Sequence, residues 1–153
     1  MKQIQLKSGE TVLVDDDDFD NLSCFYWYKS RKYAITNIRI SKGVWKSVSM
    51  HRMIVDCKPG QYVDHVNNNG FDNRKSNLRI CTPAENNRNK PAASKNASGF
   101  KGVSLYKKTG KWVAYIGTNG KNKNLGYFDT PEAAHEAYKQ AAQQYHGNFA
   151  RFN

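Results

Sequence analysis

The sequence predicts an α+β protein made of two successive parts, and three observations support this. The first 50 residues alternate between apolar and polar side chains in short runs around turn residues, as β-hairpins do. Residues 63–89 follow the order strand, loop, strand, helix. Residues 98–153 contain three short strand patterns and then one amphipathic helix. We therefore expect a first domain over 1–90, a linker over 91–97 and a second domain over 98–153.

Two hairpins are predicted before residue 51. Their strands are Met1 to Leu6 with Thr11 to Val14, and Tyr33 to Ile40 with Val44 to Met50. The run Asp15 to Asp18 is expected to be a solvated loop without a metal, because it lacks the spacing of a calcium loop. Trp27, Tyr28 and Trp45 are expected to be packing aromatics.

The segment 63–89 is the most informative. Val63 to Val66 predicts a strand that ends in a turn of asparagines and Gly70. Leu78 to Cys81 predicts a second strand, and Thr82-Pro83-Ala84-Glu85 is a capping box with proline at the first helical position. Asn86 is therefore expected in the first turns of a helix, in the same small unit as the first strand.

Three side chains of this unit have complementary chemistry. His65 is a natural base at neutral pH, because an unperturbed imidazole has a pKa of about 6.5. Asp64 and Asn86 offer hard oxygen ligands, which suit Mg²⁺ or Mn²⁺. An activated water and a cation are what phosphodiester hydrolysis requires. No structural zinc is expected, because the cysteines lack C-x-x-C spacing; they are Cys24, Cys57 and Cys81.

The spacing resembles that of the HNH endonucleases of the ββα-metal class. Asp64-His65 is followed by Asn77 and then Asn86, and D-N-R-K-S-N-L-R-I at 72–80 is similar to the phage and intron-borne homing subgroup. The resemblance implies that His65 is the general base and that Asn77 is a structural brace. It also implies that Asp64 and Asn86 bind one divalent metal ion, with Mg²⁺ preferred and Mn²⁺ as the alternative. The chain departs from the motif's name in having asparagine at its last position.

Other residues near this motif have open roles. His51 either begins a short helix or sits near a phosphate, and its spacing does not decide between these. Asn87 and Asn89 are expected on the helix surface, with either able to replace Asn86 if the register differs by a residue. The density of cations around the motif favours contacts to a phosphate backbone. These cations are Arg74, Lys75, Arg79 and Arg88.

The last 56 residues predict a three-stranded antiparallel sheet packed on a helix. The strands are Phe100 to Tyr106, Lys111 to Gly117 and Lys123 to Phe128, separated by turn residues that contain glycine. Thr130 and Pro131 open the helix, and Gly147 ends it. A stripe of alanines along the helix lets it lie close to a sheet face made by Trp112, Ala114 and Ile116. The other sheet face is left to fit a DNA major groove.

This segment resembles the apetala-two, or ethylene-response-factor, DNA-binding domain of plants. The similarity is carried by S-G-F-K-G-V-S, G-K-W-V-A-Y-I, L-G-Y-F-D-T-P-E-A-A and G-N-F-A-R-F-N. It implies that the sheet reads DNA. The positions implied are Lys101, Ser104, Tyr106, Tyr115, Asn122 and Asn124, with Lys111 and the lysines at 107, 108, 121 and 123 adding phosphate contacts. Most of the family's arginines are replaced, so the plant target sequence does not carry over.

Charge agrees with a nucleic-acid partner. The chain has 24 Lys and Arg against 13 Asp and Glu, a formal net charge of +11. The excess is not confined to a tail, since residues 1–90 hold 15 basic and 10 acidic side chains and residues 91–153 hold 9 and 3. No apolar run approaches a membrane span, and the N-terminus lacks a signal core, so a cytoplasmic protein is expected, in the host cell if phage-encoded.

The sequence thus predicts a metal-dependent DNA endonuclease that acts as a monomer on double-stranded DNA, with a homing, mobile-element or phage role implied by the resemblance. The main alternative is a catalytically inactive, sequence-specific DNA-binding protein such as a transcription regulator. Binding or cleavage of RNA is a third reading, which rests on charge and aromatic content alone.

Overall fold

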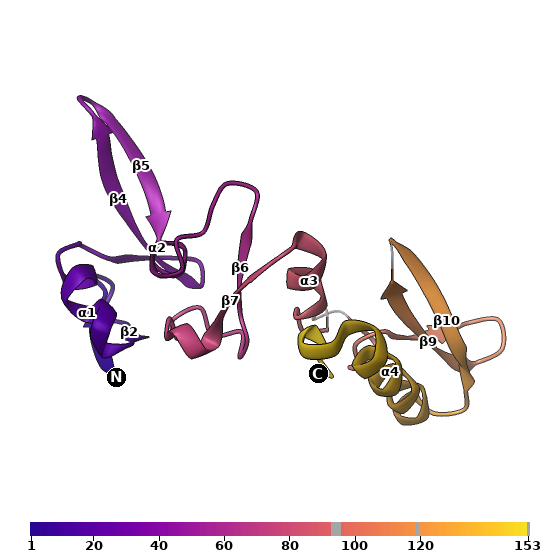
Figure 1. Ribbon diagram of the computed structural model, residues 1–153. Helices are drawn as coiled ribbons and strands as arrows, with labels where there is room; N and C mark the ends of the chain where they lie inside the picture. The colour runs from indigo at the N-terminus through magenta and orange to yellow at the C-terminus, as the bar shows by residue number, and fades with distance from the viewer. Residues whose placement is uncertain (93–95, 119, 153) are drawn as a thin grey trace. The chain divides into compact units, whose positions relative to one another are not determined.

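The computed structural model describes residues 1–92, 96–118 and 120–152. The chain divides into two compact units, Met1–Asn86 and Asn87–Asn153, coloured indigo to rose and rose to yellow in Figure 1. Part of the predicted linker, residues 93–95, lies outside the described residues. Both units mix helices with antiparallel strands, so the predicted α+β class is confirmed.

The N-terminal unit begins with a hairpin, as predicted. β1 (Lys2–Gln5) pairs with β2 (Thr11–Val14), placing Ile4 opposite Val12. The next element corrects a prediction, because Asp15 to Asp18 is not a loop. Asp16 opens the helix α1 (Asp16–Ser23), whose first turn holds three aspartates. Carboxylates are favourable there, because the first turn exposes unpaired N–H groups and the positive end of the helix dipole.

A three-stranded sheet follows in the order β3 (Tyr28–Ser30), β4 (Tyr33–Ser41), β5 (Val44–Ser49). The short helix α2 (Met50–Ile54) starts directly after β5. The core of the unit joins residues from both hairpins, α1 and α2. Its fully buried side chains include Val12, Val14, Trp27, Ala34 and Met50.

The rest of the N-terminal unit forms the predicted strand, loop, strand and helix. β6 (Tyr62–His65) pairs with β7 (Leu78–Cys81), and α3 (Pro83–Arg88) follows. A 3₁₀ turn, Lys75–Asn77, precedes β7. The capping box is confirmed in both directions, because the Thr82 N–H donates to Glu85 Oε2 at 2.8 Å and the Glu85 N–H donates to Thr82 Oγ1 at 3.2 Å.

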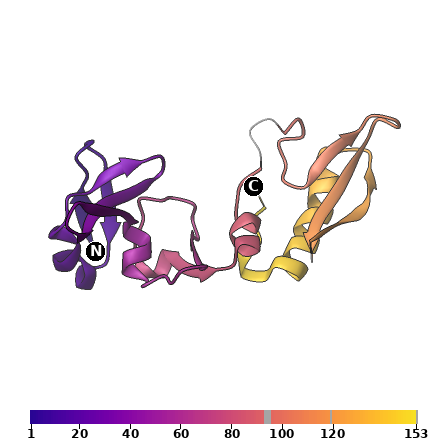
Figure 2. The same cartoon turned by 90° about the horizontal axis from the view of Figure 1, so that it is seen from above.

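The C-terminal unit is a three-stranded sheet covered on one face by a helix (Figures 1 and 2). Its strands β8 (Val103–Tyr106), β9 (Lys111–Thr118) and β10 (Lys121–Phe128) lie in the order β10-β9-β8, and α4 (Pro131–His146) is followed by a 3₁₀ turn, Gly147–Phe149. The alanine stripe behaves as predicted. Ala134, Ala141 and Ala142 are buried against the sheet, which contributes Trp112, Ala114 and Ile116 to the same core.

Trp27 and Trp45, which were both expected to be packing aromatics, differ in their exposure to solvent. Trp27 is buried, and its indole N–H donates to the Leu22 carbonyl at 2.8 Å. Trp45 is 62% exposed, so its assignment as a packing aromatic is wrong. It lies on β5 near the end of a hairpin that extends beyond the rest of the unit (Figure 1). Among the helices that the structure describes, none is long and apolar enough to cross a membrane.

Gly102 lets β8 approach α4 closely. It has φ +73°, and a Cβ built there would lie 2.3 Å from the Tyr138 ring. We expect Gly102→Ala to destabilise the C-terminal unit by about 3 kcal/mol, through overpacking and a left-handed backbone. The control is Gly110→Ala, which has φ +71° and no atom within 4 Å, and should lose only about 1 kcal/mol. Equal losses in urea unfolding would contradict this account.

Candidate active site and DNA-binding face

His65, the predicted general base, ends β6 and is buried. Its Nε2 lies 3.1 Å from Oδ1 of Asn73. The Asn73 amide group faces the other way, with Nδ2 at 3.5 Å from the Gly70 carbonyl and 3.6 Å from the Met50 sulfur. Because Oδ1 of Asn73 is an acceptor, this contact favours the tautomer with the proton on Nε2 and the basic lone pair on Nδ1.

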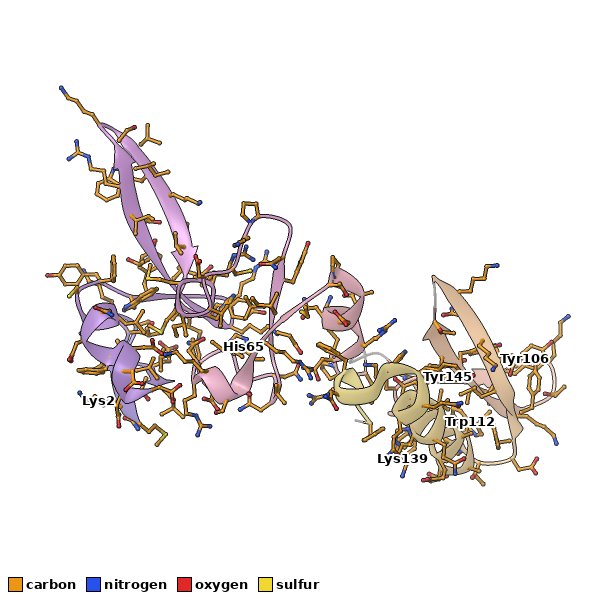
Figure 3. The ribbon with its side chains drawn as sticks, viewed as in Figure 1. Lys2, His65, Tyr106, Trp112, Lys139 and Tyr145 are labelled. Carbon is orange, nitrogen blue, oxygen red and sulfur yellow. The ribbon has the colours of Figure 1, made fainter. Side chains whose placement is uncertain are left out.

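Two further rings complete the surroundings of His65 (labelled in Figure 3). The Tyr33 ring stacks on it with centroids 5.7 Å apart, and the His51 ring meets it edge-on at 5.0 Å. His51 is the second residue of α2 and is itself buried, with Nδ1 lacking a hydrogen-bond partner in the structure. The structure thus brings together a histidine whose role the spacing left open and a tyrosine that sequence reasoning missed.

Burial keeps both histidines neutral. Desolvation is the largest cause of the lowered pKa of His65, with Lys32 acting in the same direction, while Asn73 and the carboxylates of Asp64 and Asp72 oppose it. Desolvation, and then the proximity of His65, lowers the pKa of His51 to about 3. At neutral pH, His65 is consequently in the form that accepts a proton.

Asn77, the predicted brace, spans the loop between β6 and the 3₁₀ turn. Its Nδ2 donates to the Asp72 carbonyl at 2.7 Å and to Oδ1 of Asn67 at 2.9 Å. Its Oδ1 accepts from the Asn67 N–H at 3.0 Å. These are the contacts that a structural brace requires, because one buried carboxamide holds the loop backbone at two points.

The same loop is fixed to the N-terminal hairpin. The Leu13 N–H donates to the Phe71 carbonyl and the Asn73 N–H donates to the Leu13 carbonyl, both at 2.8 Å. Gly70 allows the loop to lie against the chain at Lys32, since a Cβ there would be 2.0 Å from that carbonyl oxygen. Asn73 is therefore positioned by β2. Sequence reasoning missed Asn73, although it lies within the quoted motif at 72–80, because the contact with His65 arises only once the loop folds back.

Asp64, the predicted metal ligand, lies next to His65 on β6, so the two side chains leave opposite faces of the β6–β7 ribbon. Its partner across the ribbon is Arg79. Arg79 Nη2 is 2.6 Å and Nε 2.8 Å from Oδ2 of Asp64. The carboxylate is 5% exposed and the guanidinium 19%. The charge of the carboxylate is thus balanced by a cation of the chain itself.

The other predicted ligand, Asn86, is half-buried in α3, where its N–H donates to the Thr82 carbonyl at 3.0 Å. A carboxylate and a carboxamide are donor types that suit a magnesium-type ion, which keeps several waters and shares few protein oxygens. Asp64 lies on β6, whereas Asn86 lies on α3, beyond the β6–β7 pair. The described segments 1–92, 96–118 and 120–152 contain no cluster of three or more His, Cys, Asp or Glu suited to a metal. Any divalent ion here would therefore depend on Asp64 and would meet Arg79 beside it.

The cations predicted to contact phosphates are largely engaged within the unit. Arg74 is paired with Asp72 at 2.6 Å, and this guanidinium is the main cause of the lowered pKa of Asp72. Lys75 is paired with Asp18 at 2.9 Å. With Arg79 on Asp64, three of the four predicted cations lie on carboxylates of the chain. Arg88 ends α3.

Asn87 and Asn89 were expected on the helix surface. Asn87 is exposed, with Oδ1 accepting from Lys90 Nζ at 2.6 Å. Asn89 lies beyond the end of α3 and is 4% exposed, so a surface position is wrong for it.

Most of the residues predicted to read DNA share one face of the C-terminal sheet. In the antiparallel register, Ser104 lies opposite Val113, Tyr106 opposite Lys111, and Asn124 opposite Tyr115. This face is opposite to the Trp112, Ala114 and Ile116 face that packs on α4, and Figure 3 shows Tyr106 projecting away from the helix. Asn122 belongs to the same face. Tyr127 joins it, stacking edge-on with Tyr106 at 5.3 Å, and the sequence reasoning had not included it.

Three lysines depart from the predicted arrangement. Lys101 is half-buried, and its ammonium donates to the carbonyls of Arg88 and Lys90, the second at 2.6 Å. Burial lowers the pKa of Lys101 to about 8. Lys123 lies on the α4 face, where Nζ donates to the Tyr145 hydroxyl at 2.8 Å. Lys111 is on the outer face but paired with Asp129 at 3.2 Å.

Both units of the chain are similar to known proteins. Protein 3.8 of Escherichia phage T7 is 34% identical over 93 residues, which cover 61% of this chain and 76% of the relative. The chain belongs to the protein 3.8 family. This member of the family is also 26% identical over 150 residues to an uncharacterized HNH endonuclease, L560, of Acanthamoeba polyphaga mimivirus, covering 95% of this chain and 75% of the relative. The predicted HNH resemblance is thereby confirmed.

The second unit of this protein 3.8 family member carries an AP2 domain, matched over residues 98–148. The AP2-like ethylene-responsive transcription factor TOE2 of Arabidopsis thaliana is 38% identical over 71 residues, 46% of this chain and 14% of the plant protein. AP2 domains bind DNA, so the predicted DNA-binding domain is confirmed at this level. No solved structure matches the chain.

Removing one member of the Asp64–Arg79 pair should destabilise the N-terminal unit more than removing both. Asp64→Ala leaves a largely buried guanidinium without its carboxylate, for which we expect a loss of about 3 kcal/mol in the free energy of unfolding. Arg79→Met combined with Asp64→Ala should recover at least about 1 kcal/mol of this. Urea unfolding of the two single variants and the double variant measures the coupling. Strictly additive losses would show that the pair is not coupled.

The buried histidines should make stability fall in acid. Because the pKa of His51 is about 3 in the folded chain and about 6.5 when unfolded, the unfolded state binds more protons between these values. Stability gained from His51 is therefore present above pH 6.5 and lost as pH falls towards 3, by at most about 1.4 kcal/mol per pH unit. Urea unfolding between pH 4.5 and 7.5 measures the slope. His51→Gln does not titrate and should flatten it; an unchanged slope would exclude His51 as the cause.

Proposed function

We propose that this chain is a metal-dependent DNA endonuclease of the HNH type, which hydrolyses phosphodiester bonds with His65 as the general base. The observation that carries the proposal is the buried His65, whose Nε2 lies 3.1 Å from Oδ1 of Asn73 and whose pKa burial lowers. This imidazole lies in a ββα unit of a chain that also has an AP2 domain. A distant relative named as an HNH endonuclease supports the reaction class.

The chain's own residues account for most of the proposed reaction. Nδ1 of His65 takes a proton from the attacking water, and Asn73 orients the ring for that transfer. Tyr33 and His51 exclude water from the other sides of the ring. Asp64, with Asn86, would hold one divalent cation, Mg²⁺ or Mn²⁺, and such an ion would supply positive charge for the departing 3′ oxygen. Asn77 keeps the intervening loop in place and is not required to touch DNA.

We also assign the DNA contacts of the AP2 domain to its outer sheet face. The residues there are Ser104, Tyr106, Lys111, Tyr115, Asn122 and Asn124. This face gives the proposed nuclease a way to stay on duplex DNA, and the phage and viral relatives favour a role in a phage or mobile element. We infer a monomer, because each unit has its own buried core.

One observation favours a second candidate function. Asp64 is already neutralised by Arg79, and a single carboxylate is a small ligand set for a catalytic ion. A chain in which Arg79 permanently replaced the metal would be a catalytically inactive, sequence-specific DNA-binding protein, such as a transcription regulator. Such a protein would bind DNA equally well with and without divalent ions and would not cut it.

The histidine variant separates these functions. We expect the wild-type chain to convert supercoiled plasmid to nicked or linear forms with Mg²⁺ or Mn²⁺ and not with a chelator. His65→Ala should lower the rate at least about 100-fold while DNA binding, measured by fluorescence anisotropy, stays unchanged. The matched control is His135→Ala, which removes a histidine of the AP2 domain, stacked on Phe100, and should keep its cleavage rate.

Circular dichroism and urea unfolding establish that each variant is folded. Cleavage by His65→Ala at the wild-type rate would refute the assigned base. Intact plasmid with every metal, accompanied by normal DNA binding, would favour the inactive DNA-binding protein.

A further inference from the structure

The N-terminal unit contains a long stretch without any acidic residue. Between Asp20 and Asp56 the chain has seven basic residues and neither aspartate nor glutamate. These residues are Lys29, Arg31, Lys32, Arg39, Lys42, Lys46 and Arg52. The stretch includes all of β4 and β5. Lys29 is paired with Glu10 at 2.6 Å, and the cations on β4, β5 and the turn between them are Arg39, Lys42 and Lys46.

The β4–β5 hairpin presents this charge together with an exposed aromatic ring. Arg39 and Trp45 are direct cross-strand partners, so their side chains leave the same face. Both are exposed, and Lys42 lies in the turn beyond them. Arg39 Nε donates to the Ser41 carbonyl at 3.3 Å, which keeps its guanidinium near the hairpin end. The hairpin extends from the body of the unit (Figure 1), so this face is open to a large partner.

The same face leads to the candidate active site. Along β4, the side chains of Tyr33, Ile35, Asn37 and Arg39 alternate onto one side, and Ser47 lies opposite Asn37 on β5. Tyr33, at the start of this row, is the residue whose ring stacks on His65. The opposite face includes Thr36, which is buried against the body of the unit. A row that is polar and basic beyond Ile35 thus runs from Tyr33, beside His65, to the exposed end of the hairpin.

We propose that this outer face of the β4–β5 hairpin is a second DNA-contacting surface, which holds the duplex beside the active site through Arg39, Lys42 and Trp45. A two-stranded β-ribbon fits a DNA groove, and uncompensated cations favour the phosphate backbone. Trp45 adds an apolar contact to sugars or bases. The proposal shares its partner with the proposed function, but it concerns binding and does not require cleavage.

Duplex DNA fits this face better than an apolar protein partner. Beyond Ile35 the row contains Asn37, Ser47 and Arg39, which are polar or charged, and the exposed ring of Trp45. Two further exposed apolar side chains, Ile40 and Val44, lie at the end of the same hairpin. A strongly basic surface lacking carboxylates is complementary to a uniformly anionic partner. The AP2 sheet face, by contrast, carries one lysine paired with Asp129 and several neutral side chains. The hairpin would therefore add salt-sensitive contacts to those of the AP2 domain.

Trp45 itself reports on the contact. Trp27 is buried and Trp112 is partly covered by the α4 interface, so the tryptophan most open to a soluble quencher is Trp45. We expect a saturating 30-base-pair duplex to reduce acrylamide quenching of the full-length chain, and Trp45→Phe to lose this DNA-dependent change. A chelator prevents cleavage during the measurement. Unchanged quenching on DNA saturation would overturn the proposal.

Affinity and salt dependence give an independent test. The Arg39→Ala/Trp45→Ala double variant should bind the duplex roughly tenfold more weakly at physiological salt. Its slope of log affinity against log salt should be smaller by about 0.9, the value for one phosphate contact. The matched control is Lys7→Ala, which removes one cation of the same unit outside the hairpin. In the structure, the Lys7 ammonium lies over the Tyr26 ring.

The outcomes separate this proposal from the nuclease assignment. A double variant that is folded but binds with the affinity and salt slope of Lys7→Ala would overturn the hairpin surface, whatever the cleavage rate. Protection of Trp45 by structured RNA but not by duplex DNA would also overturn it. Loss of binding in the double variant, with no cleavage by the wild-type chain, would support the hairpin surface and reject the nuclease.

Discussion

The arrangement of the loop after β6 in the N-terminal unit depends on the hydrogen bond between His65 and Asn73. A buried imidazole needs a partner for its N–H, because an unsatisfied buried donor costs about 1–3 kcal/mol. Asn73 can supply that partner only if the loop after β6 folds back. Asn77 holds this loop from one side and Leu13 from the other. The first hairpin, remote in sequence, thereby contributes to the orientation of the proposed base.

Charge in the N-terminal unit is separated into a neutralised and an uncompensated region. Near the ββα motif, Asp64, Asp72 and Asp18 each take a cation from the chain. Such pairs fix geometry and leave little free charge for a ligand. The β4–β5 hairpin has cations with no acidic residue in the same stretch of sequence. The number of basic residues near a motif therefore does not show which surface attracts a polyanion. A cation that is paired with a carboxylate of the chain adds little net charge to its surface.

Local sequence signals were sufficient for much of the fold. β7 begins and ends where its apolar run predicted, and the Thr82–Glu85 capping box placed α3. These features depend on neighbours in the chain. The helix α1 was missed because Asp16 to Asp18 were taken as solvated charge, although carboxylates stabilise a first helical turn. Tyr33 and Asn73 were missed because their contacts with His65 join distant segments, and the exposure of Trp45 follows from how far its hairpin extends.

The Asp64–Arg79 pair also bears on how the chain matures. Small domains whose ligands are unpaired in the apo form often cannot fold until their ion arrives. Here a guanidinium already satisfies the carboxylate, and the buried core of the unit is made by hydrophobic side chains of other elements. The carboxylate that the proposed function gives to the metal therefore has a partner from the chain itself, so folding of this unit would not require an ion. On the proposed function, the divalent ion would bind to a unit that is already folded.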